Sequence, residues 1–79
     1  MIQGYYVQTH IRDGMCGTEI VGNFHYDDLD EAFVRARREA EGIPEHFAEG
    51  SYVDVVAIRD GKLDEAPIRR YTLFDGVTA

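Results

Sequence analysis

His10, Cys16 and His25 are the residues of this sequence that could combine into a reactive or metal-binding site. A thiol beside an imidazole is the arrangement of a cysteine nucleophile with its base, and imidazoles together with a thiolate can bind zinc. Both uses require the three side chains to converge on one point. Because the sequence has no C-x-x-C or H-x-x-x-H spacing, convergence depends on how the flanking segments pair.

A β-hairpin over residues 2–26 is the element that must position these side chains. Asp13-Gly14 supplies the positive φ angles of a two-residue type I′ turn, so we expect Val7 to face Ile20. That register gathers apolar side chains on one face, the predicted core of the hairpin: Tyr5, Val7, Ile11, Cys16, Ile20 and Phe24.

The same register separates the histidines from the cysteine. His10 and His25 point to the face opposite Cys16, because side chains alternate along a strand. We therefore expect no catalytic residue, no metal site and no cofactor. An alternative pairing stays open, since Gly17 can widen the loop to residues 13–17 and change which side of the second strand is buried.

Asp27, Asp28, Asp30 and Glu31 form an acidic cluster after the hairpin. The cluster lacks the glycine and the distant glutamate that let a calcium loop wrap its cation. Asp28 instead suits the N-cap of a helix, with Glu31 at the matching position of a capping box. We expect a helix to begin here, and the four carboxylates to steer the protein towards a basic surface.

Apolar residues recur at helical spacing after this cap and make one stripe, which we expect to lie on the sheet: Leu29, Ala32, Phe33, Ala36 and Ala40. Gly42 is placed to be a left-handed residue after the helix, and Pro44 cannot continue it. The helix should therefore end near Glu41.

Residues 51–59 are rich in β-branched and aromatic side chains and predict a third strand. Asp60-Gly61 repeats the hairpin signal, but Pro67 follows, so we expect the fourth strand over residues 68–74 after a longer loop. The expected pairs include Val55 with Tyr71. Together the segments predict one α+β domain over residues 1–79, a single antiparallel sheet of about four strands (ββαββ) with one helix packed across one face.

The third strand is apolar on both of its faces, and one helix can cover only one of them. We expect the uncovered face to be a contact surface, since large exposed apolar patches usually bind something. The predicted partner-binding residues on this outer face are Tyr6, Tyr52, Val56, Ile58, Ile68, Arg70 and Phe74. The alternative is that residues 43–50 or the C-terminal tail fold over this face.

Composition and charge limit the compartment and the kinds of partner that we expect. The chain has 79 residues, one cysteine and a formal charge of −7, so we expect a cytoplasmic protein without disulfides that repels nucleic acid phosphates. No membrane span or export signal is expected. The acids could also imitate a phosphate backbone and occupy the groove of a nucleic-acid-binding protein.

The layout of two hairpins flanking one helix, at Asp13-Gly14, Asp28 and Asp60-Gly61, resembles small phage-encoded anti-CRISPR proteins. The resemblance is one of organisation over the whole chain and carries no diagnostic motif. It implies a stoichiometric inhibitor that binds a CRISPR effector in the host cytoplasm. We therefore expect a non-enzymatic protein-binding domain, monomeric or homodimeric, that inhibits or regulates a partner with a basic surface. The alternative is a small homodimeric ligand-binding or accessory domain of a metabolic or regulatory system.

Overall fold

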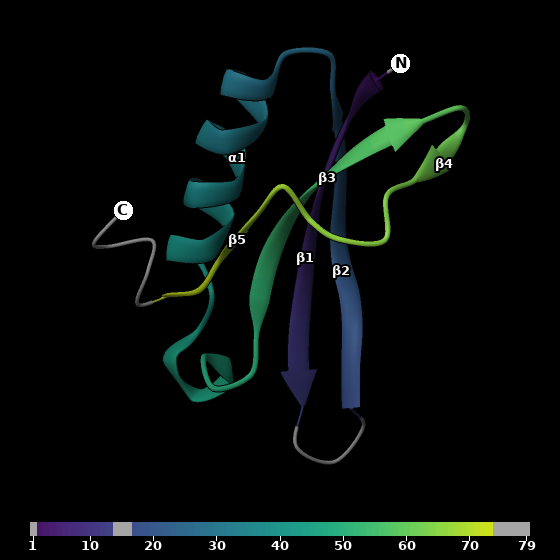
Figure 1. The fold of residues 1–79 in the computed structure, drawn as a ribbon. Helices are drawn as coiled ribbons and strands as arrows, with labels where there is room; N and C mark the ends of the chain where they lie inside the picture. Colours follow the sequence, from purple (N-terminus) through teal and green to yellow (C-terminus); the bar gives the residue numbers. More distant parts are fainter. Residues whose placement is uncertain (1, 14–16, 74–79) are drawn as a thin grey trace.

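The computed structural model describes residues 2–13 and 17–73, which form a curled antiparallel sheet with one α-helix (Figure 1). The elements are β1 (Ile2–Asp13), β2 (Gly17–Tyr26), α1 (Leu29–Glu41), a 3-10 helix (Glu45–Phe47), β3 (Tyr52–Arg59), β4 (Lys62–Leu63) and β5 (Arg69–Tyr71). β1 lies between β2 and β3, and β4 and β5 both pair with the far edge of β3. The predicted α+β fold is confirmed. Neither helix in the described residues is long and apolar enough to cross a membrane.

The register of the first hairpin differs from the predicted one. Asp13 faces Gly17, so the wider loop is right and the two-residue Asp13-Gly14 turn is wrong. Gly17 has a φ of 85°, a left-handed conformation that favours glycine at the end of a longer loop. The pairing then shifts by one residue between Thr9 and His10, where β2 contains a bulge.

This bulge changes which β2 side chains are buried. Before it, Ile20 faces His10 and is 55% exposed, so the prediction that Ile20 belongs to the core is wrong. After it, Phe24 faces Val7 and packs against the core, as predicted. Cys16 lies outside the described residues.

Helix α1 begins and ends where its sequence signals predict. The Asp28 carboxylate accepts a hydrogen bond from the Asp30 backbone N–H at 3.3 Å, and the helix ends at Glu41. Gly42 has a φ of −83°, which is right-handed, so the predicted left-handed conformation of this residue is wrong. Its N–H still donates to helix carbonyls, including that of Arg38 at 3.2 Å. The helix end is therefore satisfied without a left-handed residue.

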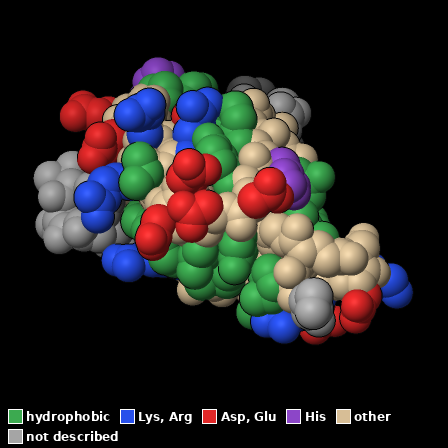
Figure 2. Space-filling view, turned by 90° about the horizontal axis from the view of Figure 1, so that it is seen from above, with side chains coloured by type: hydrophobic (Ala, Val, Ile, Leu, Met, Phe, Trp, Pro, Cys, Tyr) green, Lys and Arg blue, Asp and Glu red, His purple; other side chains and the backbone are tan. Residues whose placement is uncertain are grey.

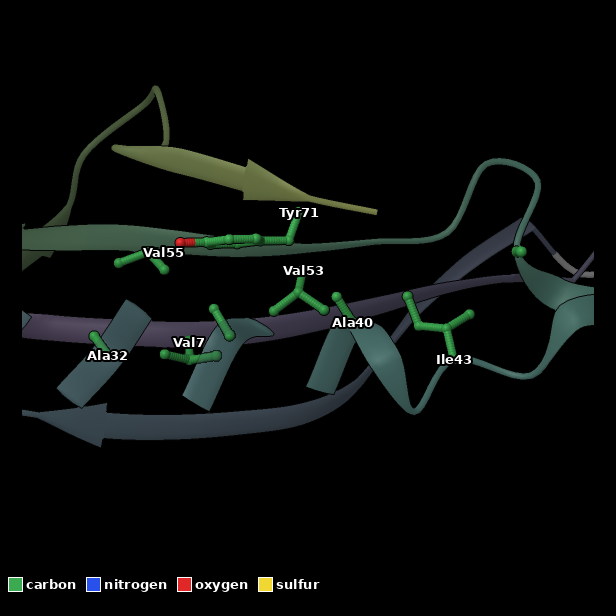
Figure 3. Close-up of a cluster of buried hydrophobic side chains, with 9 residues drawn as sticks. Val7, Ala32, Ala40, Ile43, Val53, Val55 and Tyr71 are labelled. Carbon is green, nitrogen blue, oxygen red and sulfur yellow. The ribbon is translucent and has the colours of Figure 1, made fainter. Parts of the chain in front are cut away.

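The core lies between α1 and one face of the sheet (Figure 3). Three alanines of the predicted stripe, Ala32, Ala36 and Ala40, are fully buried, and their small side chains let the helix backbone approach the strands. Val7, Val53 and Val55 fill the sheet side, and Ile43, Ala48 and Tyr71 close the ends of the cluster. Residues 43–50 therefore contribute to the helix side of the sheet.

The second hairpin turns tightly at Asp60-Gly61, so the hairpin signal of this pair is right and the longer loop predicted after it is wrong. Both residues have positive φ, 51° and 77°, and Arg59 faces Lys62 across the turn. The returning strand starts at once as β4, and the Asp64 N–H still donates to the Ala57 carbonyl at 2.9 Å. The chain leaves the edge over residues 65–67, rejoins it where the Ile68 N–H donates to the Val55 carbonyl at 2.7 Å, and continues as β5. The strand predicted over residues 68–74 therefore corresponds to β5, which ends at Tyr71, and β4 was not predicted.

The pairing of β5 is offset by two residues from the predicted one, because Val53 rather than Val55 faces Tyr71. An offset of two preserves the face of each side chain, since alternation has a period of two. Tyr71 therefore lies on the helix side, as predicted, and Arg70 lies on the opposite side beside Asp54.

Candidate functional site

The face of the sheet opposite α1, called the open face below, carries the even-numbered residues of β1 and β3. Tyr6 faces Val56, Gln8 faces Asp54, and His10 faces Tyr52 across these two strands. The helix packs on the odd-numbered residues instead, as Val7, Val53 and Val55 show. The predicted division of the sheet into a covered face and an uncovered face is therefore present in the described residues.

A row of four side chains crosses the open face from β5 to β2. The Arg70 guanidinium carbon lies 3.9 Å from the centroid of the Tyr52 ring. The Tyr52 ring stacks on His10 with centroids 4.6 Å apart and planes 21° apart. His10 in turn faces Ile20 across the hairpin. This central row, Arg70, Tyr52, His10 and Ile20, presents a cation, two rings and an aliphatic group side by side.

Asp54 is the acid that interrupts the apolar open face, and Arg70 neutralises it. The Asp54 carboxylate is 6% exposed and accepts two hydrogen bonds, from Arg70 Nε at 2.7 Å and from Nη2 at 3.1 Å. The hydrogen bond to Asp54 raises the pKa of Arg70 above its usual range. The fork thus fixes the guanidinium in place over Tyr52.

Some of the residues predicted to bind a partner are accessible to solvent, and others are buried. Tyr6, Tyr52 and Ile58 are half-buried, and Ile68 is 43% exposed. Val56 is 6% exposed and offers almost no contact area, so it supports the open face from within. Phe74, the last predicted residue, lies outside the described residues, as does the C-terminal tail. Residues 43–50 do not cover this face, because Ile43, Phe47 and Ala48 pack against the core on the helix side.

Two exposed apolar residues of the open face were missing from the predicted set. Leu63 is 44% exposed and faces Ile58 across the β3–β4 turn, and Ile20 continues the central row. The Asp60-Gly61 turn contains the signal for Leu63, since a two-residue turn fixes the facing pairs. The signal for Ile20 is Gly17, since a loop that ends at Gly17 sets Asp13 opposite Gly17 and therefore His10 opposite Ile20.

His10 is a half-buried titratable group of the open face. Its Nε2 atom has no hydrogen-bond partner within the described residues. Burial lowers the pKa of His10 below 6.5, Asp54 opposes this effect, and Arg70 adds to it. A neutral ring stacked on Tyr52 is the state that this surrounding favours.

The reactive grouping considered from the sequence does not assemble in the described part of the chain. His10 stacks on Tyr52, whereas the His25 ring lies edge-on to Tyr6 with centroids 5.4 Å apart. No group of three His, Cys, Asp or Glu side chains suited to a metal ion occurs within residues 2–13 and 17–73.

Two hollows lie beside the sheet. One, of about 460 Å³, adjoins the central row and is lined by Ala48, Glu49, Gly50, Ser51, Tyr52, Arg70 and Thr72. The other, of about 400 Å³, runs along α1 where it meets β2 and is lined by Tyr26, Asp30, Glu31, Val34, Arg35 and Arg38. The first lies at the end of the open face, and the second lies at the opposite edge of the sheet.

The acidic cluster predicted to steer binding lies at the turn between β2 and α1. Asp27, Asp28, Asp30 and Glu31 are all exposed there. Figure 2 looks down on this end of the molecule and shows acidic side chains gathered beside hydrophobic ones. Carboxylates at this end project charge into solvent without interrupting the central row.

Comparisons of the chain with protein-family models, with curated proteins and with solved structures found no significant match. The geometry of the open face, the acidic turn and the two hollows is therefore the basis for the functional proposal. Of these, the open face brings together the largest number of the predicted site residues.

Proposed function

We propose that this protein is a non-enzymatic protein-binding domain that inhibits or regulates its partner through the open face. The observation that supports this most directly is the central row, flanked by the exposed side chains of Leu63 and Ile68 on a face that α1 does not cover. Apolar surface of this kind gains free energy when a partner removes it from water, about 25 cal/mol per Å².

The composition of this face suits an interface. Tyr and Arg are enriched in protein interfaces and often account for most of the binding energy. Here Arg70 is already held by Asp54 and by the Tyr52 ring. Binding would therefore cost little further side-chain entropy at this position, because the guanidinium is ordered before the partner arrives.

The charge of the chain supports a partner with a basic surface. A net charge of −7 on 79 residues creates a negative field that accelerates encounter with positive surfaces at low salt. Asp27 and Asp30 lie at one end of the molecule, where they can steer an approach without taking part in the apolar contact. A protein complex that binds nucleic acid has such a surface, and the CRISPR effectors suggested by the resemblance are the first candidates.

The direct experiment measures inhibition of purified CRISPR effector complexes cutting a target DNA duplex. We expect cleavage to fall in proportion to added protein and to stop near a stoichiometric amount. Leu63→Glu and Ile68→Glu should each abolish inhibition, since a charge on the open face would be buried against the partner. Pro44→Glu is the matched control, because Pro44 is also exposed and apolar but lies in the loop after α1, away from the open face.

Circular dichroism and thermal unfolding would show that each variant folds. Inhibition that persists in folded Leu63→Glu and Ile68→Glu chains would remove the open face from the proposal. Loss of inhibition in Pro44→Glu alone would move the contact surface to the helix side of the sheet. An absence of inhibition with every effector type tested would reject this class of partner.

The role of the acids is separable by salt. If they only steer, Asp27→Lys with Asp30→Lys should slow association while dissociation stays nearly constant. If they imitate phosphates in the contact itself, the same change should speed dissociation, and wild-type affinity should fall steeply with salt. Stopped-flow or surface-binding kinetics at two salt concentrations distinguish these outcomes.

A further inference from the structure

β2 is a long strand with one unpaired edge in the described sheet. Its ten residues pair with β1 on one side, and the order of the sheet places no strand on the other. Exposed strand edges recruit further strands unless lysine, proline or a bulge protects them. β2 contains neither lysine nor proline, and the register shift opposite Thr9 and His10 leaves Gly22–Tyr26 regularly paired. This part of the edge is therefore open to another strand.

The small number of acidic residues in β2 allows a second copy to approach this edge. The chain contains fifteen acidic residues, and Glu19 is the one acid within β2. Two copies that each carry a charge of −7 repel one another over most of their surfaces. Repulsion is reduced along β2, which contains one acidic residue in ten.

Apolar side chains flank the same edge on both faces of the sheet. Val21 on β2 is exposed, and Val34 on α1 is 62% exposed. Val34 and Tyr26 line the groove of about 400 Å³ that runs between the helix and the strand. A strand added to β2 would place its helix-side side chains along this groove, and β2 itself carries Phe24 and Tyr26 on that side.

The charged residues along the α1 side of the groove are arranged so that the groove of one copy is complementary to the groove of a second copy. Asp30 and Glu31 lie at one end, Val34 in the middle, and Arg38 at the other end, spaced along one side of the helix. Arg35, which also lines the groove beside Val34, is paired with Glu39 of the same helix at 3.3 Å. A two-fold axis reverses this order in the second copy. The acidic end of one helix then approaches the basic end of the other, and the two valines come nearest the axis.

We propose that two copies of this chain associate about a two-fold axis, with β2 pairing antiparallel to β2 and the two α1 grooves facing each other. Such pairing continues the sheet through both copies, so the two helices lie on one side. The two open faces then lie together on the other side. A partner would meet a surface twice as long as that of one copy, which permits bivalent binding. This inference concerns the β2 edge and does not depend on the partner proposed for the open face.

The test uses sedimentation velocity and light scattering on the purified chain over a range of concentrations. We expect a dimer for the wild type. Val34→Glu should weaken the dimer about tenfold or more, because it places two carboxylates near the axis. Glu45→Arg, a charge change on the exposed 3-10 helix, is the control and should leave the dimer unchanged.

A mixing experiment tests the symmetry directly. Glu31→Arg alone and Arg38→Glu alone should each be monomeric, because each sets like charges opposite one another across the axis. An equal mixture of the two variants restores opposite charges at both ends, so we expect a heterodimer. A monomeric wild type, a dimer that resists all three changes, or a mixture that stays monomeric while its components are folded would overturn the proposal. Inhibition assays on the monomeric variants show whether the open face still inhibits when the dimer is lost. Failure of the dimer proposal and failure of the proposed function can therefore be distinguished.

Discussion

The two faces of the same sheet are stabilised in different ways. On the helix side, Val7, Val53 and Val55 are fully buried under three alanines, so the contacts there are apolar and closely packed. On the open face, the side chains are held by stacking and by an ion pair, as in the row from Arg70 through Tyr52 to His10. The first arrangement supplies the core, and the second leaves ordered side chains accessible to water.

Side chains alternate between the two faces of the sheet along each β-strand. The residues that stabilise the fold and the residues proposed to recognise a partner therefore lie on opposite faces. Adjacent residues of β5, Arg70 and Tyr71, serve opposite faces although they follow one another in the chain. A substitution at one should therefore change folding, and a substitution at the other should mainly change the surface. The predictions below test this separation, beginning with the largest expected effect.

Tyr71→Ala should destabilise the fold more than Tyr52→Ala. Tyr71 is 2% exposed within the core, and removing a buried aromatic side chain costs about 3–5 kcal/mol. Tyr52 is half-buried on the open face, and we expect its loss to cost about 1–2 kcal/mol, mainly through the stacking with His10. Urea denaturation of the three proteins measures both free energies of unfolding. Equal losses would mean that the open face contributes to the core as much as the helix side does.

Arg70→Ala should be the most damaging change among the polar residues of the open face. It leaves the Asp54 carboxylate, which is largely buried, without its two hydrogen bonds. Because the Arg70 side chain is half exposed and water can partly replace it, we expect a loss of about 1–2 kcal/mol.

Arg59→Ala is the matched control for that change. Arg59 pairs with Asp64 at 2.8 Å, but both side chains are accessible to water, so we expect a smaller loss of stability than for Arg70→Ala. Thermal unfolding at low and at high salt compares the two variants. A larger loss for Arg59→Ala would show that the Asp54–Arg70 pair does not organise the open face.

The stability of the protein should fall as the pH drops below 6.5, in part because of His10. Burial lowers the pKa of His10 in the folded state, Asp54 opposes this decrease, and Arg70 adds to it. The unfolded chain then binds more protons than the folded chain in this range, so acid favours unfolding. The stabilisation is complete above pH 6.5 and is lost as the pH falls towards the lowered pKa. His10→Gln should flatten this part of the profile, measured by urea denaturation from pH 5 to pH 8, and an unchanged slope would count against it.

The helix and the faces of the later strands could be predicted because their signals are local. The cap at Asp28 and the spacing of Ala32, Ala36 and Ala40 depend only on nearby residues. The face of Tyr71 was right despite a two-residue offset, because such an offset preserves alternation. Local chemistry therefore determined which side of the sheet these residues occupy.

The bulge in β2 and the central row could not be predicted, because both depend on contacts between distant segments. Phe24 lies beneath Arg35 of α1, whose guanidinium carbon is 3.9 Å from the ring centroid, and this packing accompanies the bulge that brings Phe24 to the helix side although Ile20 lies on the open face. The pairing of Arg70 with Asp54 requires the β5 register, which is set after residues 65–67 leave the sheet edge and Ile68 rejoins it. A one-residue shift in the strand pairing of either hairpin would move members of the central row to opposite faces of the sheet.

Ile68→Ser should have the smallest effect on stability of the changes considered. Ile68 is 43% exposed, and its link to the sheet is a hydrogen bond from its backbone N–H to the Val55 carbonyl at 2.7 Å, which serine retains. We expect the free energy of unfolding to change by about 0.5 kcal/mol or less, as at other surface positions. Hydrogen exchange of the Ile68 amide would show whether that bond persists. A loss of about 2 kcal/mol or more would show that Ile68 is packed like a core residue, and the open face would then be part of the protein's own interior.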